Sequence, residues 1–215
     1  MLSTTIIILL FLILGLSKIS LIPSKRQSLV EISYEFIANM INDNVGKDGM
    51  KYLSFVFTLF LFILLGNLLG MLPYSFTWTS HIIVTFTISF FIFVGVTIIA
   101  IYKHGILKFL SFFAPSGVPK PMLFLLVPIE VISYLSRPIS LSVRLFANMM
   151  AGHTLLKVIG GFVFVLASNS YIVGGILPLS FLVALTGLEI VIAFLQAYVF
   201  AILTCLYIND AIHLH

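Results

Sequence analysis

The sequence is poor in charged residues, cysteine and catalytic motifs, and each scarcity excludes a class of protein. Only 8% of its 215 residues are charged and 61% are hydrophobic, which excludes a soluble globular domain with a charged surface. The single cysteine, Cys205, excludes an internal disulfide and a multi-cysteine metal site. No nucleotide motif, metal-ligand cluster or nucleophile triad is present, so we expect no catalytic site, no cofactor and no metal. The net charge of +4 is too small and too dispersed to indicate nucleic-acid binding.

Long apolar runs are what the sequence has instead, and they predict an all-α membrane protein. Runs of about 20 apolar residues have the length of a transmembrane helix. We expect about five membrane-embedded helices and one amphipathic surface helix, the last two helices being long, steeply tilted and antiparallel. They would form a single membrane domain over residues 1–215. Its parts are an N-terminal helix and surface helix (1–51), a helical hairpin (52–121) and a longer hairpin (122–215).

The first half of the chain contains the shorter helices. The apolar run at about 4–22 lacks the basic start and cleavage site of a signal peptide, so we expect it to be retained. Ser28–Val45 has an apolar stripe opposite acidic residues, which predicts a helix on the membrane surface or, alternatively, against a soluble partner. Helices follow at about 52–72 and 81–102. Gly66 and Gly70 form a GxxxG pattern, which lets a neighbouring helix approach closely.

Basic residues flank only one side of the predicted crossings, and this asymmetry predicts the topology. By the positive-inside rule, the basic side faces the cytoplasm or the mitochondrial matrix. The N-terminus would then lie on the opposite side and the C-terminus on the basic side. The flanking residues are Lys18, Lys25, Arg26, Lys47, Lys51, Lys103, Lys108 and Lys120.

The segment from Glu130 to His153 carries ionisable residues within a stretch that is otherwise apolar enough for a bilayer. An arginine at bilayer depth costs about 2.5–3.5 kcal/mol on insertion scales, so such a residue predicts a function. Polar and small residues recur there at steps of three or four, on one helix face that we expect to meet protein or water. They are Glu130, Ser133, Arg137, Ser140, Arg144, Ala147, Asn148 and Ala151. Small residues of the last helix, Ala193, Ala197 and Ala201, would let an external helix approach.

Two helical segments, at about 122–157 and 176–207, would each be about 50 Å long, against about 30 Å of hydrocarbon, so they must tilt. One hairpin register, with its midpoint near residue 170, aligns three pairs in depth. They are Arg144 with Gln196, Glu130 with Asp210, and His153 with Glu189. Protonatable groups on both sides of a fixed cation describe two half-channels that do not connect, because arginine cannot pass its proton on. Alternatively, these residues only hold the helices together by hydrogen bonds.

At these residues the chain resembles subunit a of the F-type ATP synthase. The matching stretches are GNLLGMLPYSFTWTSHI, IYKHG, PIEVISYLSRPISLSVRLFANMMAGH and LEIVIAFLQAYVFAILTCLYINDAIHLH. The resemblance implies a stator subunit that provides two offset proton half-channels to a ring of c subunits and couples proton flow to rotation and ATP synthesis. It also implies a peripheral stalk and other small membrane subunits as partners, within the lipid bilayer.

The resemblance implies a role for each matched residue near the arginine. Arg144 matches the stator arginine that faces the carboxylate of the ring, and Gln196 matches its neighbour. The role of Arg137 is left open: it either neutralises Glu130 or belongs to a proton path. Ser140 is equally well explained as a hydrogen-bonding residue between helices.

Five further residues match the two proton paths of the family. His153 and Glu189 match the entry path, and we place Asn148 with them, although a hydrogen bond between helices explains it equally well. Glu130 and Asp210 match the path on the matrix side.

The order of the entry-side pair predicts the membrane in which the chain resides. Many bacterial relatives have the acid at the position of His153 and the imidazole at that of Glu189, whereas this order is similar to mitochondrial forms. We therefore expect a multi-pass protein of the mitochondrial inner membrane with its C-terminus in the matrix. The alternative is the bacterial plasma membrane.

Two other classes of membrane protein fit the sequence less well. A self-contained channel or secondary transporter would show an inverted repeat or a pair of broken helices, and neither is found. A proton-pumping subunit of a respiratory complex would use buried lysines. Here Lys157 is the only lysine within the last two helical segments, near the expected turn.

Overall fold

The computed structural model describes residues 1–16, 23–71, 77–106, 108–109, 120–168 and 172–212, and the regular structure in these residues is helical. The elements are α1 (Leu2–Leu16), α2 (Lys25–Asn44), the 3₁₀ turn η1 (Lys47–Tyr52), α3 (Leu53–Gly70), the 3₁₀ turn η2 (Trp78–Ser80), α4 (Ile82–His104), α6 (Lys120–Ser168) and α7 (Ile172–Ile212). Within these residues, four segments are long and apolar enough to cross a membrane: Lys47–Gly70, Ile82–His104, Met122–Leu166 and Pro178–Ile212. The predicted all-α membrane fold is confirmed.

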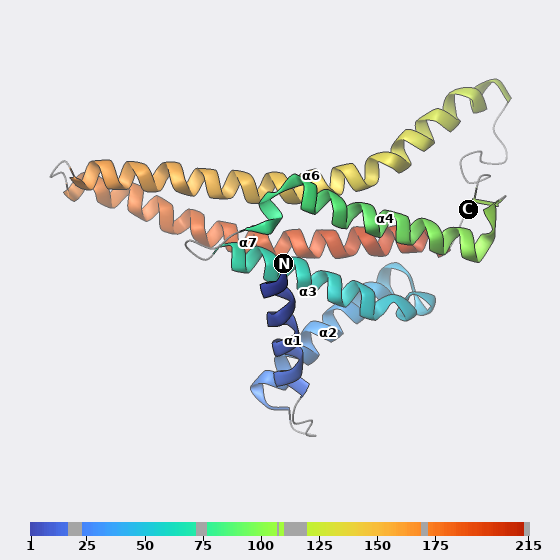
Figure 1. Cartoon of the computed structure of the whole chain (residues 1–215), viewed down its shortest axis with the longest axis horizontal. Helices are drawn as coiled ribbons and strands as arrows, with labels where there is room; N and C mark the ends of the chain where they lie inside the picture. The colour runs from blue at the N-terminus through green and yellow to red at the C-terminus, as the bar shows by residue number, and fades with distance from the viewer. Residues whose placement is uncertain (17–22, 72–76, 107, 110–119, 169–171, 213–215) are drawn as a thin grey trace.

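Helices α6 and α7 form the predicted antiparallel hairpin, which runs along the longest axis of the molecule (Figure 1). They contain 49 and 41 residues, so at 1.5 Å per residue they are about 74 and 62 Å long, at least twice the hydrocarbon thickness. Such helices must tilt steeply. The first part of α6 bends away from α7 (Figure 1). Pro128 and Pro138 lie inside α6 and lack the N–H that a straight helix needs, which accounts for a bend.

Both hairpin helices extend beyond their predicted ends, whereas the predicted turn between them, at 169–171, lies outside the described residues. Helices α3 and α4 match the predicted boundaries within two residues. They cover the hairpin, with α3 packed against α7 and α4 in contact with both α6 and α7.

Alanines of α7 allow the close contact between α7 and α3. Ala193, Ala197 and Ala201 are fully buried, and the carbonyl of Ala193 accepts a hydrogen bond from Asn67 of α3. Short side chains let two helices approach closely. The expectation that this stripe receives an external helix is therefore wrong, because the chain's own α3 occupies that side.

Helices α1 and α2 pack together beside α3, and α1 runs across the direction of the hairpin (Figure 1). The 15 residues of α1 span about 22 Å, and its predicted end at residue 22 lies outside the described residues. The predicted apolar stripe of α2 is divided. Ile37 and Ile41 are buried against the chain, whereas Leu29 and Ile32 are exposed, where lipid can cover them.

The GxxxG pattern of α3 receives the η2 segment and not a neighbouring helix. A Cβ atom at Gly66 would overlap the indole of Trp78, and one at Gly70 would overlap the side chain of Thr77. The Trp78 ring also packs on Phe62, with their centroids 4.8 Å apart. The glycines therefore form a notch that fixes the η2 segment against α3, and η2 in turn contacts α6.

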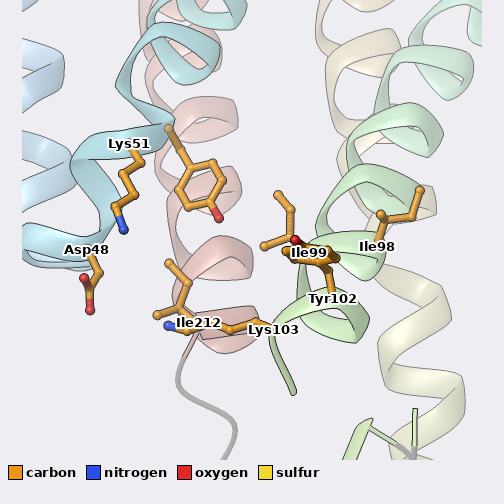
Figure 2. Close-up of a pocket in the computed structure, with 8 residues that line it drawn as sticks. Asp48, Lys51, Ile98, Ile99, Tyr102, Lys103 and Ile212 are labelled. Atoms are coloured by element: carbon orange, nitrogen blue, oxygen red, sulfur yellow. The ribbon is translucent and has the colours of Figure 1, made fainter. Parts of the chain in front are cut away.

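Basic residues from separate parts of the chain line one cleft beside the C-terminal end of α7. A cleft of about 520 Å³ is lined by Lys51 of η1, by Tyr102 and Lys103 of α4, and by Ile212 at the end of α7 (Figure 2). This arrangement brings two of the predicted basic flanks to the same end of the molecule as the end of α7. The membrane side on which this end lies stays a prediction.

We expect Gly66→Ala to destabilise the fold, because the added methyl group overlaps an indole that packs against Phe62 on α3. Overpacking of this kind costs about 1–3 kcal/mol. Gly95→Ala on α4 is the matched control, since a methyl group there meets nothing within 4 Å. The measurement is the temperature at which the detergent-solubilised protein aggregates. Equal aggregation temperatures for the two variants would contradict the claim that Gly66 is needed to accommodate Trp78.

Candidate functional site

His153 of α6 and Glu189 of α7 lie together, as the sequence predicts. The distance from His153 Nδ1 to Glu189 Oε1 is 3.8 Å. The Glu189 residue is only 5% exposed, and neither carboxyl oxygen has a hydrogen-bond partner among the described residues. Gly152 makes room for this carboxyl group, because a Cβ atom there would lie against Oε1. A buried carboxyl group is stable when it is paired or protonated, so Glu189 suits a group that gains and loses a proton.

The other nitrogen of His153 is held from the η2 side. Its Nε2 atom lies 3.1 Å from the hydroxyl oxygen of Thr77, and the Thr77 hydroxyl group also donates to the carbonyl of Gly70 at 3.0 Å. Residues of α3, η2, α6 and α7 thus converge on one imidazole. Sequence analysis missed Thr77, and the signal available was the polar run TWTSH in a turn between two apolar helices.

A second polar level lies further along the hairpin. The side-chain amide of Asn148 donates to Gln196 Oε1 at 2.8 Å. The predicted partner of Gln196 was Arg144, one helical turn away from Asn148, so the register that correctly places His153 beside Glu189 does not hold at this level. A cavity of about 240 Å³ next to this level is lined by Asn148, Gly152 and Glu189 with leucines around them.

Arg144 lies on the open face of α6. Its side chain is exposed, and no hydrogen bond or ion pair joins it to another residue in the part of the chain that the structure describes. Ser140, Ala147 and Ala151 are exposed on the same helix. The polar and small face predicted for α6 therefore points away from the rest of the chain at this depth, where a partner can reach it.

A third level joins Arg137 of α6 to Asp210 of α7. Arg137 Nη1 lies 2.8 Å from Asp210 Oδ2, and the guanidinium group stacks between the rings of Tyr134 and Tyr207, at 5.3 and 5.1 Å from their centroids. Cation–π contacts of this kind stabilise a cation away from water. The ionic partner of Arg137 is therefore Asp210 and not Glu130, and a role of Arg137 in a proton path stays a prediction.

Glu130 does not meet Asp210, contrary to the predicted register. It is half-buried and forms no hydrogen bond or ion pair with the described residues. Its position in the first part of α6 explains the difference, because that part diverges from α7 (Figure 1). The pairing assumed two straight helices, and α6 is bent.

Buried polar atoms without partners accompany the first two levels. Such atoms need hydrogen bonds, and ordered water commonly supplies them in protein interiors. Within the described residues the atoms are Asn67 Oδ1, Trp78 Nε1, Thr79 Oγ1, Ser89 Oγ, both carboxyl oxygens of Glu189 and Gln196 Nε2. Asn67 and Thr79 were not singled out from the sequence, although each is a polar residue next to an apolar run.

Comparison with known proteins gives a consistent family. A family model described as "ATP synthase A chain" matches residues 1–209. ATP synthase subunit a of Pelagibacter ubique is 62% identical over 215 residues, which cover 100% of this chain and 86% of that protein. ATP synthase subunit a of Allorhizobium ampelinum is 58% identical over 205 residues, 94% and 82% of the two chains. The same subunit of Acidiphilium cryptum is 52% identical over 218 residues, 100% and 86% of the two chains.

We expect Arg137 and Asp210 to stabilise the protein jointly. Arg137→Gln and Asp210→Asn each break the ion pair, so the double variant should lose less stability than the sum of the two single variants. The Asp210 side chain is 44% exposed, and solvent screening limits the coupling to about 0.5–1 kcal/mol.

The measurement is a double-mutant cycle on the thermal stability of the solubilised protein. The matched control is the cycle of Arg137→Gln with Glu130→Gln, whose effects should add because the two residues do not pair. A larger coupling in the control cycle would favour Glu130 as the ionic partner of Arg137.

Proposed function

Because the chain belongs to the ATP synthase A chain family, we propose that it is the stator subunit that presents two offset proton half-channels, separated by Arg144, to a ring of c subunits. As a member of this family it is a proton-translocating membrane subunit of the ATP synthase and not a catalytic subunit. ATP chemistry therefore takes place on other chains of the complex. We further propose that a peripheral stalk and other small membrane subunits hold the chain against the rotating ring.

One observation carries this proposal: Arg144 is an exposed cation on an apolar helix, and it has no ionic partner among the residues that the structure describes. In a bilayer such a cation needs an anion or water nearby. A carboxylate on a neighbouring ring of helices would supply the anion. Ser140, Ala147 and Ala151 are small and exposed beside Arg144, so a partner helix could come close enough to bring its carboxylate to the guanidinium group.

The two sides of Arg144 differ in a way that supports separate paths. On one side lie His153 and Glu189, about 14 Å from Arg144 along the helix at 1.5 Å per residue. On the other side lies Asp210, which pairs with Arg137 about 10 Å from Arg144 by the same measure. Arginine keeps its proton in a protein, so a proton cannot pass through Arg144 from one side to the other.

The proposed cycle uses the ring as the carrier between the two sides. A proton from His153 and Glu189 neutralises a carboxyl group of the ring, which can then rotate through lipid. After nearly a full turn this group meets Arg144, whose charge favours the ionised carboxylate. The proton then leaves by the side of Asp210 and Glu130. The membrane potential contributes about 2.3 kcal/mol per charge for each 100 mV.

The relatives named above are bacterial, and they favour the bacterial plasma membrane over the expected mitochondrial inner membrane. The order of His153 and Glu189 does not separate the two locations, because alphaproteobacterial members are similar to mitochondrial forms. We propose that the end of the molecule with Lys51 and Lys103 faces the cytoplasm, as the positive-inside rule requires.

Arg144→Ala should abolish coupled ATP synthesis, because the ring carboxylate then loses the charge that drives its release of the proton. The measurement is ATP synthesis by membrane vesicles under an imposed proton gradient, with equal amounts of assembled complex. Lys157→Ala is the control, since Lys157 is an exposed cation of the same helix several turns beyond Arg144. Near-normal synthesis with Arg144→Ala would refute the proposed role.

Gly152→Ala should slow proton translocation several-fold, because its methyl group displaces the Glu189 carboxyl group from its place beside His153. Gly161→Ala is the control on the same helix, since a methyl group there meets nothing within 4 Å. The measurement is the initial rate of ATP-driven proton pumping. Equal rates in the two variants would argue against Glu189 as an entry residue.

A further inference from the structure

The hydrogen bonds of Thr77 determine which nitrogen of His153 carries hydrogen. A threonine hydroxyl group has one hydrogen to donate, and here it goes to the carbonyl of Gly70. A carbonyl oxygen can only accept. Towards His153 the hydroxyl oxygen must therefore act as the acceptor, and Nε2 must be the donor in the 3.1 Å contact. In the neutral imidazole, the hydrogen then lies on Nε2, and Nδ1 keeps its lone pair.

This tautomer leaves Nδ1 as the nitrogen that meets Glu189. Nδ1 is the atom of His153 that lies 3.8 Å from Glu189 Oε1, a distance that a small side-chain rotation or one water can bridge. The Nε2 side offers no onward route, because the hydrogen of Thr77 is directed into a backbone carbonyl. A carbonyl of the peptide chain is not a proton carrier at neutral pH.

We propose that Thr77 is a positioning residue of the entry path, which holds His153 in the Nε2–H tautomer so that its Nδ1 atom alone takes up and releases the proton exchanged with Glu189. This proposal rests on the proposed function of the chain. In the step, the O–H bond of the Glu189 carboxyl group breaks as an N–H bond forms at Nδ1, giving a carboxylate and an imidazolium. The same N–H bond breaks when the proton passes, through water, to a carboxylate of the ring and forms an O–H bond there, and Nε2 keeps its hydrogen throughout.

The surroundings of Thr77 suit a residue that must not move. It is 9% exposed, and its own carbonyl accepts a hydrogen bond from the Ser80 hydroxyl group at 2.7 Å. Its side chain occupies the space left by Gly70, and the adjacent Trp78 fills the space left by Gly66. The GxxxG pattern of α3 thus fixes the segment that carries the Thr77 hydroxyl group, and through it the position of the His153 imidazole.

Two substitutions at Thr77 separate its hydroxyl group from its methyl group. Thr77→Val keeps the shape that fills the notch and removes the acceptor, whereas Thr77→Ser keeps the hydroxyl group and removes the methyl group. We expect Thr77→Val to slow ATP-driven proton pumping about two- to tenfold, the range that one hydrogen bond provides. Thr77→Ser should stay within about twofold of the unaltered complex. Rates are measured in vesicles that contain the intact complex and are divided by the amount of assembled chain.

The outcomes distinguish this role from a structural one. A slow Thr77→Ser variant beside a normal Thr77→Val variant would show that packing matters and would overturn the proposal. Normal pumping by both variants would also overturn it. A slow Thr77→Val variant that Thr77→Ser rescues would support it.

A third variant separates this proposal from the proposed function. In a His153→Ala background, Thr77→Val should cause no further loss, because the residue it positions is absent. If His153→Ala itself pumps at the normal rate, the entry path through His153 is refuted. If His153→Ala is slow and Thr77→Val is not, only the role of Thr77 is refuted.

A spectroscopic measurement tests the tautomer directly. In the intact complex labelled with ¹⁵N-histidine, the signals that disappear in His153→Ala should be those of a protonated Nε2 and an unprotonated Nδ1. Thr77→Val should add a population with the opposite tautomer. A protonated Nδ1 in the unaltered neutral imidazole would overturn the proposal.

Discussion

The arrangement depends on one fixed charge, the guanidinium group of Arg144 on the open face of an apolar helix. It cannot give up its proton, and it has no ionic partner in the described part of the chain. A counter-charge must therefore come from another molecule. The other cation of α6 near this depth, Arg137, has the opposite setting, with an aspartate and two tyrosine rings around it. Two arginines seven residues apart on one helix thus have opposite surroundings.

The polar groups around this charge are supported by the surrounding packing. Small residues decide where the elements touch: buried alanines on α7 admit α3, glycines on α3 admit η2, and Gly152 admits the Glu189 carboxyl group. The η2 segment packs into the glycine notch of α3 and also contacts α6. A substitution that changes any one of these contacts would therefore shift the imidazole of His153. The same glycine pattern that commonly joins two helices in membranes here fixes a short turn.

Much of the fold could be predicted from the sequence because apolar length and helical periodicity are strong signals in a membrane protein. The ends of α3 and α4 were predicted within two residues, and the pair of His153 and Glu189 was found from spacing alone. The other two pairs were displaced by one or two turns, since a register built on straight helices cannot include the bend of α6. Thr77 and the occupant of the glycine notch were missed because their contacts join residues far apart in the sequence, and no local pattern encodes them.

The open face of α6 also has a consequence for biogenesis. In the proposed function, a copy of the chain that enters the membrane before its rotor would expose a permanently charged group to acyl chains, at a cost that no contact among the described residues offsets. The proposed function therefore implies that the chain is more stable in the membrane when the ring is already present.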